Sequence, residues 1–178
     1  MATICSLRPN VTRDDAARNM CAGISGRLHA IHYGRLRALA DVYIPYRVFR
    51  SEIRNGKLLE TRLFGLDAVE GSLDVYSFGD QIPQTISLET TNRLEPVLDI
   101  AKSQELLADK LRRLVFRRGF FRIRELTIRL EPVQQLYIPY WAGFSGPDNQ
   151  LHLTIMDAIR RRLEGAKVRH LVHRWLAS

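Results

Sequence analysis

The chain has 178 residues, 46% of them hydrophobic and 26% charged, which is enough apolar material for one globular domain or two very small ones. An aromatic content of 8% and ordinary glycine and proline counts exclude a low-complexity, collagen-like or wholly disordered chain. No apolar run approaches the roughly 20 residues of a membrane span, and the first residues do not resemble a signal peptide. Two cysteines, Cys5 and Cys21, predict reduced thiols in the cytoplasm.

The chain is basic, with 27 Lys and Arg against 19 Asp and Glu, a formal net charge of +8. Its arginines gather in two regions, around Arg113 and Arg117 and again around Arg161. Basic faces of this kind attract nucleic acid or an acidic partner. The alternative is a solvated face that is partly neutralised by salt bridges.

An internal repeat is the most informative pattern in the sequence. The tetrapeptide Tyr-Ile-Pro-Tyr occurs at residues 43–46 and again at 137–140, 94 positions apart. Downstream of each copy comes an aspartate followed by alanine, at Asp67 and Asp157. Upstream of each copy lies a helical pattern. This conserved order along the chain predicts a duplication.

The first half of the chain predicts one helix and three strands. Thr12 caps a helix that runs to Ile24 and has acidic residues in its first turn. A strand over residues 36–53 leads to Asn55-Gly56, which is typical of a type I′ hairpin turn. A returning strand over 57–67 and a third strand over 72–78 follow.

The second half predicts a similar set of elements. Ser103 caps a helix to about Arg118. A strand over 126–131 ends at Pro132, and the repeated strand over 135–144 pairs with a strand over 150–156. A C-terminal helix docks through an apolar stripe that includes Trp175.

These elements predict an α+β fold of two related helix-plus-antiparallel-hairpin units with a C-terminal helix. The expected organisation is an N-terminal tail (1–11), a first unit (12–78), a linker (79–102) and a second unit with the C-terminal helix (103–178).

Aromatic side chains surround the proline of each repeat. The proline removes one backbone donor, so this part of each strand is expected at a sheet edge or opposite a bulge. Two interpretations follow: a groove that binds a ligand or peptide, or a packed seam between the two copies. The residues concerned are Tyr43, Tyr46, Tyr137, Tyr140 and Trp141.

Sequence motifs of catalysis are absent. No phosphate-binding loop occurs, and Ser145 lies in a hairpin turn and not in a nucleophile elbow. Cys21 is expected to fill the core, and Asp67 and Asp157 to cap turns. We therefore predict no enzymatic activity, no catalytic residue and no cofactor.

Two pairs of histidines have the spacing of metal ligands. His29 and His32, like His170 and His173, are three residues apart, which on a helix places both imidazoles on one face. The alternative is a set of histidines at the surface or at helix ends. Because no cysteine or acidic partner motif accompanies them, no metal site is predicted.

The run Leu66-Asp67-Ala68-Val69-Glu70-Gly71-Ser72-Leu73 resembles the hairpin of PepSY-like domains, and similar modules occur in bacterial proteins of unknown function. The resemblance implies a small α+β interaction or inhibitory module without catalytic residues. The second copy departs from it, because Arg160, Arg161 and Arg162 follow Asp157-Ala158-Ile159.

The function expected from the sequence is a cytoplasmic, non-enzymatic module for protein–protein interaction or assembly. Sheet edges and basic helix faces would recruit a protein partner or a second copy of the chain. The alternative is a protein that binds nucleic acid through its arginine-rich faces.

Overall fold

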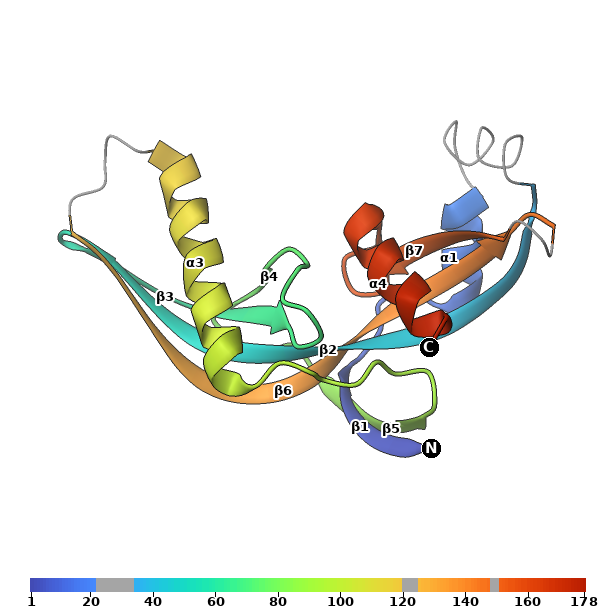
Figure 1. Ribbon diagram of the computed structural model, residues 1–178, viewed down its shortest axis with the longest axis horizontal. Coiled ribbons are helices and arrows are strands. Elements are labelled where there is room, and N and C mark those ends of the chain that lie inside the picture. The colour runs from blue at the N-terminus through green and yellow to red at the C-terminus, as the bar shows by residue number, and fades with distance from the viewer. Residues whose placement is uncertain (22–33, 120–124, 148–150) are drawn as a thin grey trace. The chain divides into compact units, whose positions relative to one another are not determined.

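The computed structural model describes residues 1–21, 34–119, 125–147 and 151–178 (Figure 1). The protein is α+β, and among the described residues more lie in strands than in helices. In chain order the elements are β1 (Ala2–Leu7), α1 (Arg13–Cys21), β2 (Leu36–Asn55), β3 (Leu58–Asp67), β4 (Tyr76–Gly79), β5 (Thr85–Thr90), α3 (Ile100–Gly119), β6 (Leu126–Ser145), β7 (His152–Asp157), β8 (Arg162–Leu163) and α4 (Ala166–Leu176).

The predicted arrangement as two helix-plus-hairpin units is wrong. The described strands form one mixed, eight-stranded sheet in the order β4-β3-β2-β6-β1-β5, with β7 beside β6 and β8 beside β7. β2 and β6 are 20 residues long and run through the repeated prolines without a break. Moreover, β1 and β5 form within the segments that were expected to be a tail and a linker.

Proline misled the prediction because its effect on a strand depends on position. Pro132 was expected to end a strand, yet it lies inside β6 and is exposed. A proline at a position whose N–H would face solvent costs the sheet no hydrogen bond. Pro45 and Pro139 are buried, and their carbonyl oxygens accept hydrogen bonds from the amides of Ala68 and Ala158.

The chain divides into two compact units. Unit 1 comprises Met1–Ile44, Ile86–Leu94 and Ile138–Ser178, and unit 2 comprises Pro45–Thr85 and Glu95–Tyr137. β2 and β6 contribute residues to both units.

In unit 2, α3 covers one face of β2, β3 and β6 (Figure 1). The core under α3 contains Phe49, Leu66, Leu107, Leu111 and Leu130. The helical spacing of apolar residues predicts a stripe of Leu106, Leu107, Leu111, Leu114 and Val115. Leu107 and Leu111 of this stripe are buried, whereas Leu114 is 38% exposed.

The predicted Ser103 cap is wrong. The helix begins at Ile100, and Asp99 caps it by accepting the amide of Lys102 at 2.7 Å. Ser103 lies within the first turn, where its hydroxyl donates to the Asp99 carbonyl.

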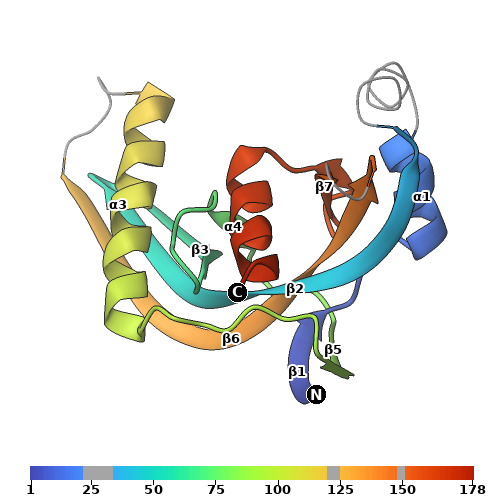
Figure 2. The same cartoon turned by 45° about the vertical axis from the view of Figure 1, so that its right-hand side comes forward.

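In unit 1, α1 packs beside the first half of β2 (Figure 2). Its core cluster consists of Val11, Ala16, Met20 and Met156. The Thr12 cap is confirmed, because its hydroxyl oxygen accepts the amide of Asp15 at 3.2 Å. Cys21 was expected in the core but is exposed at the end of α1, and Ile24 lies outside the described residues.

The C-terminal helix α4 also belongs to unit 1 and packs against β7. Its buried side chains are Val168, Leu171 and Val172. Trp175 was expected to dock the helix, but it is only half-buried. The first three residues of the predicted stripe are therefore buried, whereas Leu176, its last residue, is 49% exposed.

The turn between β2 and β3 differs by one residue from the expectation. The strands end at Asn55 and begin again at Leu58, so Gly56 and Lys57 are the central residues. Gly56 has a φ of 60°, and Arg161 is the only described non-glycine residue with positive φ. A positive φ at the first central residue alone is the pattern of a type II′ turn, not of the predicted type I′ turn.

Candidate functional site

The repeated tyrosines lie in the interior. Tyr43, Tyr46, Tyr137 and Tyr140 are 7%, 2%, 6% and 2% exposed. Trp141 is half-buried, and its Nε1 donates to the Val11 carbonyl at 3.0 Å. The four tyrosines therefore offer little exposed area to a ligand.

Two of these tyrosines differ in their surroundings. Burial, and after it the nearby carboxylate of Asp41, raises the pKa of Tyr43 to about 12. In unit 2, Tyr46 packs edge-on against Tyr76, with ring centroids 5.7 Å apart. Both side chains thus lie in the packed interior of their own unit.

The two repeated aspartates occupy matching positions in their strand pairs. Tyr46 lies opposite Asp67 in the β2–β3 pair, and Tyr140 lies opposite Asp157 in the β6–β7 pair. Both carboxylates are fully buried. We name the segments that follow the Asp67 turn (residues 67–73, unit 2) and the Asp157 turn (residues 157–163, unit 1).

The carboxylate of Asp67 organises its turn. One oxygen accepts the amides of Glu70 and Gly71 at 2.9 and 2.8 Å, and the other accepts the amide of Leu73 at 2.8 Å. Desolvation is the largest influence on this group and raises the pKa of Asp67, although the backbone amides of Leu73, Gly71 and Val69 and the charge of Lys110 act in the opposite direction. The geometry is that of a turn cap.

The carboxylate of Asp157 makes fewer contacts. Its Oδ1 accepts the amides of Ile159 and Arg160 at 2.7 and 2.8 Å. Its Oδ2 is buried without a hydrogen-bond partner among the described residues. In place of the glycine at position 71, this turn has Arg161 with a φ of 56°, and the Arg161 guanidinium donates to the Asn10 carbonyl at 2.8 Å.

The other predicted arginines lie on α3 in unit 2. Arg113 and Arg117 are exposed on this helix, next to Arg112, which pairs with Asp109 at 2.7 Å. Arg161 belongs to unit 1. The three predicted arginines therefore do not form one cluster within a single unit.

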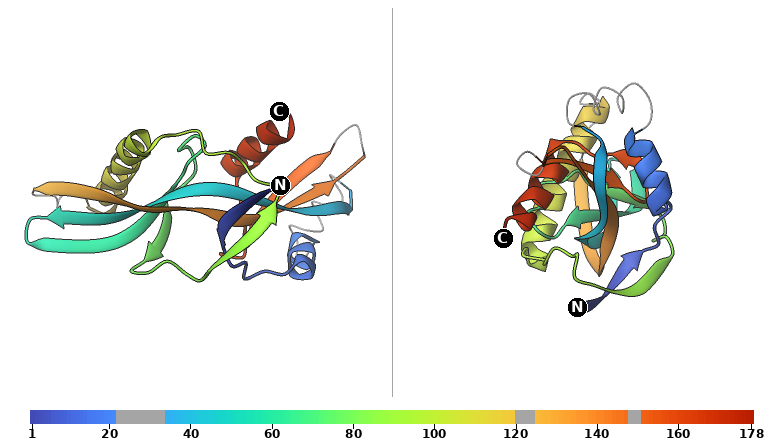
Figure 3. Two further views of the ribbon diagram at one scale, coloured as in Figure 1. Left: turned by 90° about the horizontal axis from the view of Figure 1, so that it is seen from below. Right: turned by 90° about the vertical axis from the view of Figure 1, so that its right-hand side faces the viewer.

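An open strand edge is the feature of unit 2 that the sequence did not reveal. β4 pairs only with Leu63, Phe64 and Gly65 of β3, and the register is irregular at Leu63. No described strand pairs with the outer side of Leu58–Arg62, which we call the open edge (Figure 3). Leu58 and Leu59 are 74% and 57% exposed there. Such an edge is a template for another strand.

The hairpin register determines which backbone groups face outward. Asn55 and Leu58 flank a two-residue turn, so they form a hydrogen-bonded pair. In an antiparallel pair, hydrogen-bonded and non-hydrogen-bonded positions alternate. The Glu60 amide and carbonyl therefore point toward β2, whereas those of Leu59 and Thr61 point away from it, onto the open edge.

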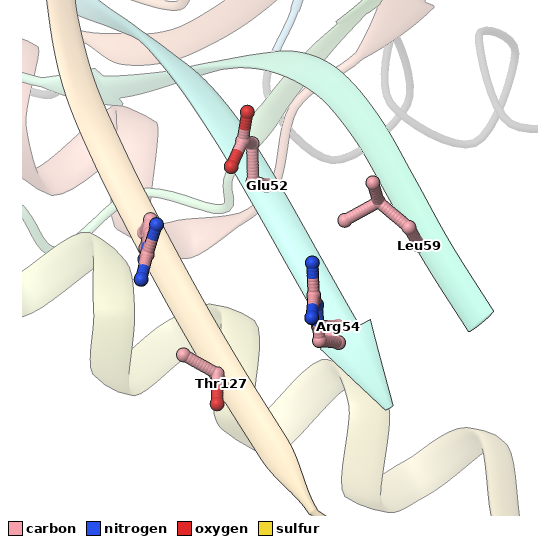
Figure 4. A pocket seen from close by; sticks show the side chains of 5 residues that line it. Glu52, Arg54, Leu59 and Thr127 are labelled. Carbon is pink, nitrogen blue, oxygen red and sulfur yellow. The ribbon is translucent and has the colours of Figure 1, made fainter. Parts of the chain in front are cut away.

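A shallow pocket of about 150 Å³ lies beside this edge (Figure 4). Glu52 and Arg54 of β2, Leu59 of β3, and Thr127 and Arg129 of β6 line it. Because Phe49 and Leu130 face α3 and side chains alternate along a strand, the pocket opens on the sheet face away from the helix. Leu59 thus joins the pocket to the open edge.

The net positive charge is larger in unit 1 than in unit 2. This unit contains 13 Lys and Arg against 7 Asp and Glu, whereas unit 2 contains 14 against 12. The side of α4 away from its buried stripe has no acidic residue. It carries Lys167, Arg169, His170, His173 and Arg174, which we call the basic face of α4.

The described residues contain no group of three or more metal-ligating side chains. His170 and His173 are exposed on α4, and His29 and His32 lie outside the described residues. Within that part of the chain, no helix is long and apolar enough to cross a membrane.

The sequence contains a second repeat that was not predicted. Leu7-Arg8-Pro9 and Leu94-Glu95-Pro96 share the pattern Leu-x-Pro, 87 positions apart. The residues after them make matching contacts: the Asn10 amide donates to the Ala158 carbonyl and the Val97 amide to the Ala68 carbonyl, both at 2.8 Å. Thr12, which caps α1, and Asp99, which caps α3, are also 87 positions apart.

No family model, curated protein or solved structure matches the chain. The resemblance of residues 66–73 to PepSY-like domains therefore stays a prediction.

Proposed function

We propose that the protein is a non-enzymatic interaction module that binds an extended segment of a partner protein along the open edge of β3. The observation that carries the proposal is the length of β3, which extends five residues, Leu58–Arg62, beyond its pairing with β4. Strand addition supplies main-chain hydrogen bonds, and a neighbouring pocket supplies specificity. The exposed free thiols of Cys5 and Cys21 support a reducing compartment, and we place the protein in the cytoplasm.

Thr61→Pro tests this proposal directly. Proline removes the outward amide of Thr61 but no hydrogen bond to β2, so the hairpin is expected to fold and to lose its partner. Thr61→Ala is the matched control, because it keeps the amide. The measurement is quantitative affinity capture from an extract of cells that produce the protein, with circular dichroism to verify the fold.

The proposal predicts a set of proteins that the wild type and Thr61→Ala retain in equal amounts and Thr61→Pro loses. If Thr61→Pro retains the same proteins as the wild type, the open edge is not the binding site.

Binding to nucleic acid is a second candidate, and the basic face of α4 favours it. This face presents five basic or titratable side chains on a unit with a surplus of positive charge. Contacts of this kind bind phosphates regardless of sequence, and counterion release makes the affinity fall with salt.

A filter-binding titration with double-stranded DNA and with RNA at about 50 mM salt tests this candidate. Replacing Arg169 and Arg174 by alanine is expected to weaken binding about tenfold or more. The matched control replaces Arg113 and Arg117 on α3, which removes the same charge from unit 2. If the wild type is not retained on the filter, or both pairs of substitutions weaken binding equally, α4 is not a nucleic-acid site.

A further inference from the structure

We infer that Glu60 determines which strand can occupy the open edge: it opposes pairing with a second copy of the chain and selects a partner segment with a lysine or arginine opposite it. This inference rests on the proposed function and assigns a charge to the partner.

The position of Glu60 follows from the register. An antiparallel partner strand would exchange backbone hydrogen bonds with Leu59 and Thr61, the two residues whose amides and carbonyls face outward. Glu60 lies between them and would face its partner residue in a non-hydrogen-bonded pair. In such pairs the Cα atoms are only about 4.5 Å apart, so the side chains are at their closest.

The two faces of the added strand have different surroundings. Glu60 lies on the face that α3 covers, because it is six residues from Leu66, whose side chain is in the core under α3, and residues an even number of positions apart share one face of a strand. Its neighbour on β2 is Ile53. Leu59 and Thr61 lie on the pocket face. The strand that fits therefore alternates, with apolar or β-branched residues opposite Leu59 and Thr61 and a charged residue opposite Glu60.

Self-pairing fails at this position. Two copies of the open edge can use the outward groups of both Leu59 and Thr61 only if the symmetry axis passes through Glu60. This register places two glutamates directly opposite each other, which is destabilising. An axis at Thr61 would instead require Leu63, whose outer side is occupied by β4.

The charge of Glu60 remains available to a partner. Its carboxylate pairs with the guanidinium of Arg62, but the two side chains are 43% and 45% exposed. Exposed pairs of this kind are weak and exchange partners readily. A basic side chain opposite Glu60 would be a second cation for the same carboxylate.

Two synthetic strand probes test the inference on the full chain. Each probe has five residues with valine at the second and fourth positions, and its central residue is lysine in one and glutamate in the other. Fluorescence anisotropy measures their affinities. The wild type is expected to prefer the lysine probe by about 3- to 30-fold. Glu60→Lys is expected to reverse the preference, and the isosteric Glu60→Gln to reduce it to less than about 3-fold.

The outcomes separate the inference from the proposed function. If both probes bind the wild type equally and Thr61→Pro abolishes both, the open edge binds strands but Glu60 does not select them. If neither probe binds, or Thr61→Pro binds them as the wild type does, the strand-edge function itself is wrong. A wild-type dimer that dissociates on Thr61→Pro would also overturn the inference, because the occupant would then be a second copy.

Discussion

The Asp67 turn and the Asp157 turn begin from the same strand geometry and end differently. Each buried aspartate lies opposite the last tyrosine of a repeated tetrapeptide. The Asp67 turn uses both carboxylate oxygens and a glycine with a φ of 66°. The Asp157 turn leaves one carboxylate oxygen without a partner among the residues that the structure describes, and it places Arg161 in the same left-handed region. The strand pairing therefore fixes the position of each aspartate, whereas the residues that follow it differ between the two turns.

Removing each carboxylate tests this difference most strongly. Asp67→Ala leaves two buried amides and the partly buried amide of Glu70 without their acceptor, and we expect a loss of about 3–5 kcal/mol in the free energy of unfolding. Asp157→Ala leaves two partly buried amides without their acceptor, and it also removes a buried oxygen that has no partner within the described part of the chain, so a loss of about 2 kcal/mol is expected. Urea denaturation of both variants measures the two values. Equal losses would mean that the two turns depend equally on their aspartates.

Gly71→Ala tests whether the Asp67 turn requires glycine. A Cβ atom at this position would lie 2.7 Å from Cδ1 of Leu106, and the φ of 66° disfavours any side chain. We expect a loss of about 1–3 kcal/mol, measured by thermal or urea denaturation. Combining the substitution with Leu106→Ala separates the two causes: recovery of stability relative to Leu106→Ala alone identifies the steric contact, and no recovery identifies the backbone.

The pH dependence of Asp67 adds a second measure of its environment. Desolvation raises its pKa in the folded state above the ordinary value of 3.8. The folded state therefore takes up a proton more readily than the unfolded state, and the contribution of Asp67 to stability is largest at low pH and decreases as the pH rises past 3.8 and through the raised pKa.

The stability difference between the wild type and Asp67→Asn isolates this contribution, because asparagine does not titrate. Urea denaturation from about pH 4.5 to 8 should show the difference shrinking as the pH rises and then becoming constant. A difference that grows with pH would show that the hydrogen bonds to the carboxylate outweigh its desolvation.

Arg161→Gly should have the smallest effect. The substitution relieves a left-handed conformation at a residue with a Cβ atom, but it loses the hydrogen bond to Asn10 and adds freedom to the unfolded chain. These contributions offset one another, and we expect a change within about 1 kcal/mol in denaturation experiments. Arg161→Ala is the informative control: it loses the hydrogen bond and keeps the strain, so it should be the less stable of the two.

Local patterns in the sequence were sufficient to predict individual elements. The Thr12 cap, the buried stripe of α3 with Leu107 and Leu111, and the buried side of α4 each depend on residues within a few positions of one another. The type of element and its buried face could therefore be predicted without knowledge of the rest of the chain.

The architecture depended on distant pairings that no local pattern records. Nothing in the composition near Pro132 indicates that the strand continues through it, because that depends on what lies beside β6. The open edge likewise exists because β4 is only four residues long, shorter than the predicted strand over 72–78. The candidate site was missed for the same reason, although the exposed Leu58 and Leu59 directly after a hairpin turn were a usable signal.

The length of the turn at Gly56 and Lys57 determines which backbone groups of β3 face the open edge. Adding one residue there without a compensating bulge would move β3 by one place against β2. The backbone amides and carbonyls of Leu58, Glu60 and Arg62 would then face the open edge. The side chain of Leu59 would move to the sheet face that α3 covers. Under the proposed function, the preference for one peptide over another would thus change with the length of this turn, although every side chain of β3 stays the same.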